Sequence, residues 1–197
     1  AQDLILEPFS GLVFGLTPGE STKLAGLQHG GVLIGMIVVA VMGNRLGAEG
    51  FGRRQTWVIG GCAASSLALI ALAAASIAGP GWPLGPTVFL LGLANGGFAV
   101  AAIGAMMGLA GADGPGREGV RIGLWGAAQA IAFGVGGFLG AAAVDATRAI
   151  FADPAPAFAL VFAAEALLFL LAARLALHVN EAESEAAPAA RFAGGAS

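Results

Sequence analysis

Five long apolar stretches, separated by short polar connectors, constrain this chain more than any other feature of its sequence. Each stretch is long enough to cross the hydrocarbon core of a bilayer, which takes about 20 helical residues. The stretches are continuously rich in Ala, Leu and Gly, whereas barrel strands alternate in units of about 10 residues, so we expect helices. The predicted fold class is an all-α membrane protein, with spans at residues 21–42, 56–78, 86–110, 122–144 and 156–178.

The composition agrees with a chain that is surrounded by lipid. Hydrophobic residues make up 57% of the 197 residues, charged residues make up 11%, and the mean hydropathy is +0.85. A soluble domain needs a charged surface to stay dispersed, whereas a membrane protein is apolar outside as well as inside. The 33 glycines suit helices that pack closely in a bilayer. A net charge of -3 argues against nucleic acid as a partner.

The connectors carry the Pro, Gly and polar residues that are typical of turns. They comprise residues 43–55, 79–85, 111–121 and 145–155. Residues 180–197 are acidic and rich in Ala, Pro and Gly, so we expect a disordered tail there.

The basic residues are divided unequally between the two sides of the predicted bundle. Lys23 and Arg148 fall on one side, and seven arginines fall on the other: Arg45, Arg53, Arg54, Arg117, Arg121, Arg174 and Arg191. Because cytoplasmic loops carry the excess of Lys and Arg, the Arg-rich side and the C-terminal tail are expected in the cytoplasm of a bacterial inner membrane.

The first residues resemble the end of a helix. The sequence does not begin with Met, and residues 1–6 are helix-compatible up to Glu7 and Pro8. We expect the last turns of an earlier span that stops at Pro8. The residues that follow are expected in an external segment, with Phe9, Leu12, Val13 and Phe14 at the lipid interface.

The connector "GNRLGAEGFGRRQTWVIGG" resembles the loop signature of the major facilitator superfamily. A Gly at a helix end is followed there by a basic loop and by Gly-Arg-Arg before the next helix, which Gly43, Arg45, Gly52, Arg53 and Arg54 match. Asn44 stands where the superfamily has an acidic residue, and this loop is longer than usual. The resemblance implies that the spans are the eighth to twelfth of a twelve-helix fold, whose N-terminal half lies upstream.

Two further segments resemble the PucC-type branch of that superfamily. "QDLILEPFSGLVFGLTPGEST" is similar to the segment after its seventh helix, and "GREGVRIGLWGAAQAIAFGVGGFLG" is similar to its eleventh helix. The resemblance implies a helper in the assembly of light-harvesting antenna complexes in the intracytoplasmic membrane of purple bacteria. Antenna polypeptides would be its partners, and bacteriochlorophyll would be a ligand that it binds or delivers.

Polar side chains inside the spans are the candidate site residues, because each requires a partner, a cavity or a ligand. They are Gln2, Asp3, Gln28, His29, Asn95, Gln129 and Glu165. In the superfamily pattern, all except Glu165 fall on helices that line the central cavity, so the resemblance implies a shared cavity for the other six.

His29 has two interpretations. A neutral imidazole can ligate the magnesium of a chlorophyll through one ring nitrogen, so His29 is a candidate pigment ligand. Alternatively, it bonds a backbone carbonyl or reaches interfacial water.

The other polar candidates also keep two interpretations each. Asn95 and Gln129 would either bind a substrate or secure a helix contact. Asp3 would be a proton or cation site in a transporter, or it would be hydrated at the outer surface. Glu165 would meet an antenna helix or a pigment, or it would bond a neighbouring helix.

Glycines and arginines complete the candidate set. Gly136 and Gly140 form a GxxxG pair, and Gly126 and Gly134 belong to a second small-residue ridge on the same helix, which predicts close packing on two faces.

The arginines of the first polar connector, Arg45, Arg53 and Arg54, are expected to serve topology and to contact anionic headgroups. The superfamily resemblance adds a latch on the cytoplasmic side, with Glu49 and Glu118 as local partners.

Catalytic patterns are weak in this sequence. Its two histidines, His29 and His178, fall at opposite ends of the predicted bundle, and no nucleotide-binding or metal-ligand motif is present. We therefore expect an antenna assembly factor without chemical turnover. The alternatives are a secondary transporter of a small solute and an inert subunit of a photosynthetic complex.

Overall fold

The computed structural model describes residues 2–45, 51–111, 118–150 and 153–193, and all regular elements in these ranges are helical. They are α1 (Gln2–Phe14), α2 (Pro18–Arg45), α3 (Phe51–Ala78), the short 3-10 helix η1 (Gly79–Gly81), α4 (Leu84–Gly111), α5 (Glu118–Ile150) and α6 (Pro154–Ala193). Five of these helices are long and apolar enough to cross a membrane, which confirms the all-α membrane class and the number of predicted spans.

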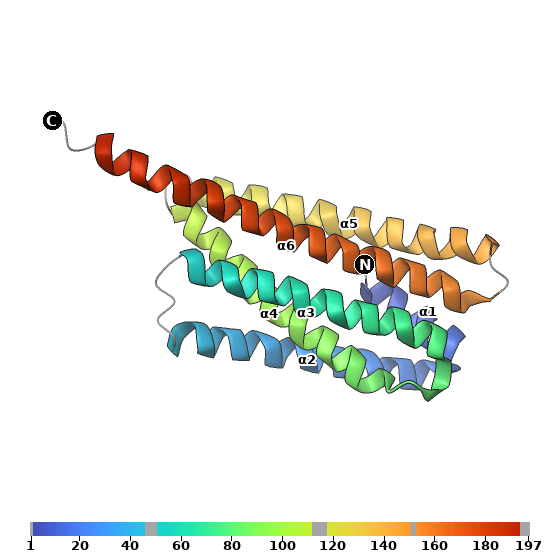
Figure 1. Ribbon diagram of the computed structural model, residues 1–197. Coiled ribbons are helices and arrows are strands. Elements are labelled where there is room, and N and C mark those ends of the chain that lie inside the picture. Colours follow the sequence, from blue (N-terminus) through green and yellow to red (C-terminus); the bar gives the residue numbers. More distant parts are fainter. Residues whose placement is uncertain (1, 46–50, 112–117, 151–152, 194–197) are drawn as a thin grey trace.

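The helices form an elongated bundle with α3 and α4 near its centre (Figure 1). α2 packs on α4, α4 packs on α3, and α3 packs on α6, with α5 beside α6. α2 and α5 therefore lie on opposite sides of the bundle (Figure 1). Consecutive long helices run in opposite directions, so the connectors alternate between the two ends.

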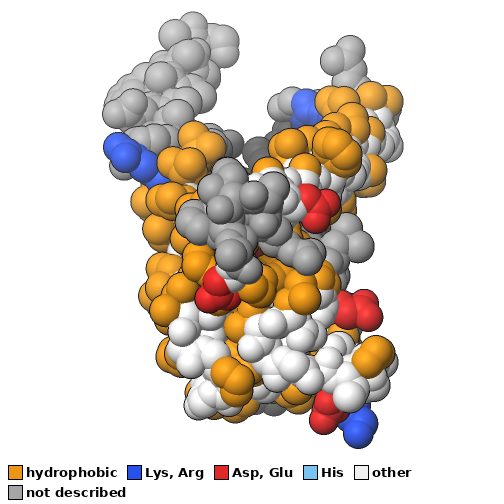
Figure 2. All heavy atoms as spheres, turned by 90° about the vertical axis from the view of Figure 1, so that its right-hand side faces the viewer, with side chains coloured by type: hydrophobic (Ala, Val, Ile, Leu, Met, Phe, Trp, Pro, Cys, Tyr) orange, Lys and Arg blue, Asp and Glu red, His pale blue; other side chains and the backbone are white. Residues whose placement is uncertain are grey.

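The lateral surface of the bundle is apolar. Figure 2, which looks onto one end of the bundle, shows hydrophobic side chains around its outline and few, separated charged groups. Many large aliphatic and aromatic side chains of α2, α5 and α6 are exposed, among them Leu33 and Phe138. Hydrocarbon is the solvent that such a surface fits, because it makes no hydrogen-bonding demand on the side chains it touches.

α2 begins three residues before the predicted span because its first turn is capped. The backbone N–H of Thr17 donates to Oε2 of Glu20 over 2.9 Å, and the Thr17 hydroxyl donates to the same oxygen over 2.8 Å. The backbone N–H of Glu20 lies 3.4 Å from the Thr17 hydroxyl, and Pro18 occupies the first helical position, where its missing N–H costs nothing.

α1 does not end at Pro8, so the predicted exit at this residue is wrong. The helix continues to Phe14, with Pro8 inside it. A proline removes one intrahelical hydrogen bond, and burial of the residues that follow offsets this cost. Phe9, which we expected at the lipid interface, is 0% exposed.

An aromatic cluster fixes α1 against α6. The ring of Phe9 lies 5.4 Å from that of Phe158 and 5.0 Å from that of Phe162, measured between centroids. The ring of Phe14, also on α1, lies 5.4 Å from that of Phe9. Edge-on contacts of this kind add to the free energy of burying the rings, so α1 is anchored in the core of the bundle.

The turn predicted at residues 79–85 is confirmed. η1 occupies Gly79–Gly81, and Gly79 has φ = 71°, a left-handed conformation that a side chain would strain. The Trp82 indole then donates to the Thr87 hydroxyl over 2.9 Å at the start of α4.

The end of the chain differs from the expected disordered tail. α6 continues to Ala193 and so includes the first fourteen residues of the segment 180–197, while residues 194–197 lie outside the described ranges. The physical reason is local composition, because alanine and glutamate dominate this segment and both are strong helix formers.

Glycines hold α2 and α4 at backbone contact. A Cβ added at Gly31 or Gly35 of α2 would collide with the carbonyl oxygens of Phe89 or Leu93 on α4. The relation is reciprocal, because a Cβ at Gly92 or Gly96 of α4 would collide with backbone carbonyls of α2. Two GxxxG pairs therefore face each other across this crossing, as small residues do where helices approach closely in a bilayer.

The glycines chosen from the sequence have a different environment. A Cβ added at Gly126, Gly134 or Gly136 would meet nothing within 4 Å, and Gly140 is half-buried. No described residue therefore makes a close contact at these three positions, and the close packing expected there stays a prediction. α5 has few neighbours here, so its ridges face open surface.

Candidate functional site

His29 lies on an exposed face of α2, in the middle part of the helix. Its Nδ1 is 2.7 Å from the carbonyl oxygen of Ala25, one turn earlier. A carbonyl can only accept, so Nδ1 carries the proton and donates it. With the imidazole neutral, Nε2 keeps a lone pair that can bind a metal ion.

The surface beside His29 is open. Gly26 and Gly30 flank the histidine at three residues before and one residue after, and a Cβ added at either glycine would meet nothing within 4 Å. Leu33, one turn further on, is 60% exposed. A broad apolar ligand can therefore approach the helix backbone next to the imidazole.

Gln28 points away from that surface. Gln28 is 3% exposed, and its backbone carbonyl oxygen is the atom that a Cβ added at Gly92 would strike. Gln28 therefore belongs to the packed crossing of α2 and α4, while His29 lies about 100° further around the same helix.

Asn95 is bound to a residue that we did not predict. The Ser65 hydroxyl of α3 donates to Oδ1 of Asn95 over 2.9 Å, and Ser65 is fully buried. The side chain of Asn95 thus joins α3 to α4, which is the helix-contact interpretation. The dipeptide Ser65-Ser66 in the middle of an apolar span is the signal that could have identified this pair.

Glu165 lies where α6 packs on α3. It is half-buried, and its Oε2 is buried. The next residue, Ala166, accepts a hydrogen bond of 3.1 Å from the Ser66 hydroxyl through its carbonyl oxygen. Two neighbouring serines of α3 therefore form hydrogen bonds inside the apolar bundle. Ser65 bonds Asn95 of α4, and Ser66 bonds the backbone of α6.

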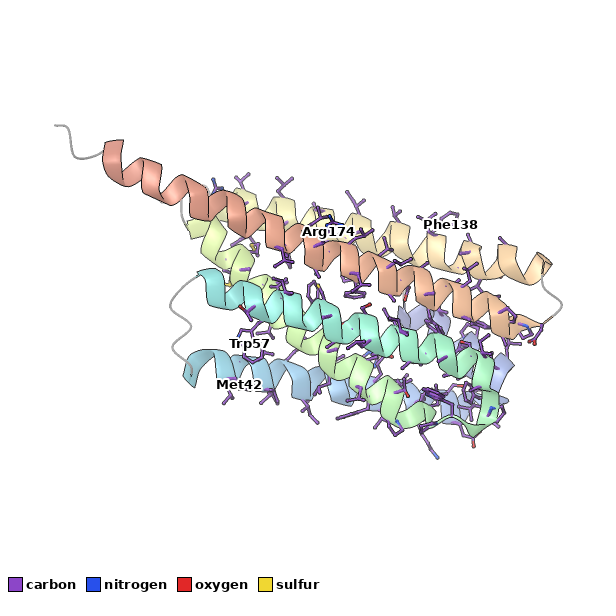
Figure 3. All side chains as sticks on the ribbon, in the orientation of Figure 1. Met42, Trp57, Phe138 and Arg174 are labelled. Atoms are coloured by element: carbon purple, nitrogen blue, oxygen red, sulfur yellow. The ribbon has the colours of Figure 1, made fainter. Side chains whose placement is uncertain are left out.

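Gln129 is exposed on α5. Figure 3 shows the side chains of this helix, with Phe138 labelled, projecting away from the rest of the bundle. Phe138 is 73% exposed on the opposite side of α5 from Gln129, and Phe133, one turn after Gln129, is 65% exposed, so the surface around this amide is apolar.

The remaining candidates are described only by their backbone. Gln2 and Asp3 lie in α1, Arg45 ends α2, and Arg53 and Arg54 lie in the first turn of α3. Their side chains lie outside the described set, as do those of Glu49 and Glu118, so the predicted latch and the role of Asp3 stay predictions.

The described side chains do not converge on one cavity. Gln28 is buried between α2 and α4, Asn95 bonds α3, and His29 and Gln129 are exposed on helices at opposite sides of the bundle (Figure 1). Among the described residues, no group of three or more His, Cys, Asp and Glu side chains could hold a metal ion. Within the described set of side chains, the arrangement offers an accessible imidazole, that of His29, with an open apolar surface around it.

Comparisons with known proteins give this arrangement a context. A model of the PUCC protein family matches residues 1–184. The chain is 55% identical over 185 residues to the bacteriochlorophyll synthase 44.5 kDa chain of Rhodobacter capsulatus, and this match covers 94% of the chain and 42% of that relative.

Two other relatives come from the same organism. The chain is 32% identical over 182 residues to Protein PucC, with 89% of the chain and 37% of the relative covered. It is 32% identical over 145 residues to an uncharacterized protein in the puhA-bchM intergenic region, with 73% and 28% covered.

The chain spans less than half the length of these relatives. No solved structure matches it significantly. The family model covers nearly the whole sequence and the most similar of these relatives is more than half identical, so the chain belongs to the PUCC protein family.

Proposed function

We propose that this chain is part of a membrane assembly factor for light-harvesting antenna complexes, which binds bacteriochlorophyll and hands it over without converting it. The observation that carries the proposal is membership of the PUCC family, together with 55% identity to a relative whose name contains bacteriochlorophyll. A bundle with five apolar helices long enough to span a membrane suits a ligand that dissolves in lipid.

The absence of chemical turnover is part of the proposal, although the name of that relative includes the word synthase. General acid–base or nucleophilic catalysis requires a reactive group within hydrogen-bond reach of a base. Two side-chain pairs among the described residues lie at this distance in the bundle interior, Ser10 with Ser21 at 2.8 Å and Ser65 with Asn95 at 2.9 Å. Neither pair includes a base, whereas an exposed imidazole suits the binding of a pigment.

We also propose the major facilitator architecture and topology that the loop signature implies. α2 to α6 would be the eighth to twelfth helices, α1 would be the end of the seventh, and the N-terminal half would complete the protein. The end of the bundle where α2 stops and α3 starts would face the cytoplasm of the inner, intracytoplasmic membrane, because Arg45, Arg53 and Arg54 lie in those turns.

The proposal is tested in a purple phototrophic host that lacks the gene. We expect the near-infrared absorbance of the antenna to fall while bacteriochlorophyll synthesis continues, and we expect the full-length protein to copurify with bacteriochlorophyll or antenna polypeptides. Normal antenna levels in the deletion strain, with no pigment or antenna polypeptide on the purified protein, would refute the proposal. Proton-coupled solute uptake into vesicles that is lost in Asp3→Asn would support the transporter alternative instead.

A further inference from the structure

We infer that Nε2 of His29 is the axial ligand of a magnesium tetrapyrrole that lies along the exposed flank of α2. The inference rests on the proposed function, and it adds the residue, the atom and the surface that receive the pigment. Its support comes from the proton position on the imidazole, the space around the ring and the depth of the residue along α2.

The proton position leaves one nitrogen available. Nδ1 donates to the carbonyl oxygen of Ala25 over 2.7 Å, which fixes the tautomer and the orientation of the ring. Nε2 then has a lone pair directed away from that bond. A hydrogen bond to the second ring nitrogen is the usual way in which a protein orients a histidine that ligates a metal.

The surface is shaped for a flat ligand. Side chains of an α-helix lean toward its N-terminus, so the ring of His29 projects over the turn that contains Ala25 and Gly26. A magnesium bound to Nε2 would hold the macrocycle tangential to α2, and a bulky side chain under its edge would push it away. Gly26 and Gly30 leave that space empty, since a Cβ at either position would meet nothing within 4 Å.

The depth suits a pigment that dissolves in hydrocarbon. α2 runs from Pro18 to Arg45, and His29 lies eleven residues after its start, or about 16 Å along the helix axis at 1.5 Å per residue. At this position the exposed neighbours are apolar, such as Leu33 and Ile34. Magnesium in a macrocycle takes an axial ligand, and a nitrogen lone pair in apolar surroundings has little competition from water.

Two substitutions separate ligation from shape. His29→Leu removes the nitrogen and keeps an apolar side chain, whereas Gly26→Leu keeps the nitrogen and fills the space beside it. Gly43→Leu is the matched control for the second change, because Gly43 lies in α2 and a Cβ there also meets nothing within 4 Å. His178→Leu is the control for loss of a histidine.

The full-length protein would be purified from a host without pigments and titrated in mild detergent with bacteriochlorophyll a and with its magnesium-free form, bacteriopheophytin a. We expect His29→Leu to weaken bacteriochlorophyll a binding by at least about tenfold and to leave bacteriopheophytin a binding unchanged. We expect Gly26→Leu to weaken binding of both pigments, and both control variants to bind as the wild type does.

A spectroscopic readout tests the bond itself. The Qx absorption and the resonance Raman bands of bacteriochlorophyll a report the number of axial ligands on magnesium. We expect them to change in His29→Leu, and we expect added imidazole to restore the wild-type bands in His29→Gly.

The outcomes distinguish the inference from the function on which it rests. If wild-type protein binds bacteriochlorophyll a and His29→Leu binds it with the same affinity and the same magnesium bands, the ligand is not His29 and the inference fails, while the proposed function stands. If the wild type binds neither pigment and does not copurify with antenna polypeptides, both fail.

Discussion

The crossing of α2 and α4 should be the most sensitive helix contact in this bundle, and Gly35→Ala tests it. The added Cβ would overlap the carbonyl oxygen of Leu93, and it would lie 2.9 Å from the carbonyl carbon of the same residue. These atoms are backbone, so no side chain can rotate away. The carbon contact is about 0.5 Å shorter than ordinary van der Waals contact, and the helices must separate by at least that distance.

The magnitude follows from this separation. A gap of about 0.5–1 Å forfeits a quarter to a half of the dispersion energy of each contact it opens. Overpacking of a close-packed interface by a methyl group costs about 1–3 kcal/mol. We expect Gly35→Ala to lower the free energy of unfolding by that amount, and we expect Gly92→Ala on the facing helix to do the same.

A matched variant on the same helix controls for the intrinsic effect of alanine. Gly43 of α2 has nothing within 4 Å of a Cβ, so Gly43→Ala should be neutral or should stabilise the helix by up to about 1 kcal/mol. Unfolding of each variant would be followed in detergent by circular dichroism. The double variant of Gly35 and Gly92 should cost less than the sum of the single variants, because the first methyl group already separates the helices. Equal stabilities of Gly35→Ala and Gly43→Ala would refute the reasoning.

Two further variants probe the parts of the bundle that hold α1 and α3 in place. Phe9→Ala should lower the free energy of unfolding by about 3–5 kcal/mol, because the ring is wholly buried. Leu12→Ala, on the exposed side of α1, should change it little. Similar melting curves for the two variants would contradict the anchoring of α1. Ser65→Ala should lower the free energy of unfolding by about 0.5–1.5 kcal/mol, because it removes the donor to Asn95. Ser65→Thr keeps the hydroxyl and should recover part of this loss. A full loss in the threonine variant would show that side-chain volume, and not the hydrogen bond, determines the stability.

The spans were predictable because a helix that crosses a bilayer needs about 20 consecutive apolar residues, and such runs are visible in the sequence. Each predicted span agrees with the structure within three residues at both ends. The small differences have local causes, such as the capping of α2 by Thr17 and Glu20, which extends a helix into polar sequence. The continuation of α1 through Pro8 was not predictable from local rules, because it depends on the burial of Phe9 against a helix about 150 residues away in the chain.

The pairing of helices was harder to predict than their existence. GxxxG spacing occurs at many positions, among them Gly31 and Gly35, Gly92 and Gly96, and Gly136 and Gly140, and we chose the last of these pairs from the sequence. Spacing alone states that a helix can be approached closely, and only the fold decides which faces meet. The same limit applies to Asn95, because its partner Ser65 is thirty residues away on another helix.

Two faces of α2 differ in their surroundings: one packs on α4, and the other carries the exposed His29. One face, with Gly31 and Gly35, is held at backbone contact with α4, where any movement would open a close-packed surface. The imidazole of His29 projects from a face about 120–160° away, and its own hydrogen bond to Ala25 ties the ring to the backbone of this helix. A ligand is bound more tightly when its site is already in the required geometry, because less conformational entropy is lost on binding. The close crossing of α2 and α4 therefore gives His29 a rigid support, so that binding or release of the pigment inferred above would not disturb the packing of the bundle.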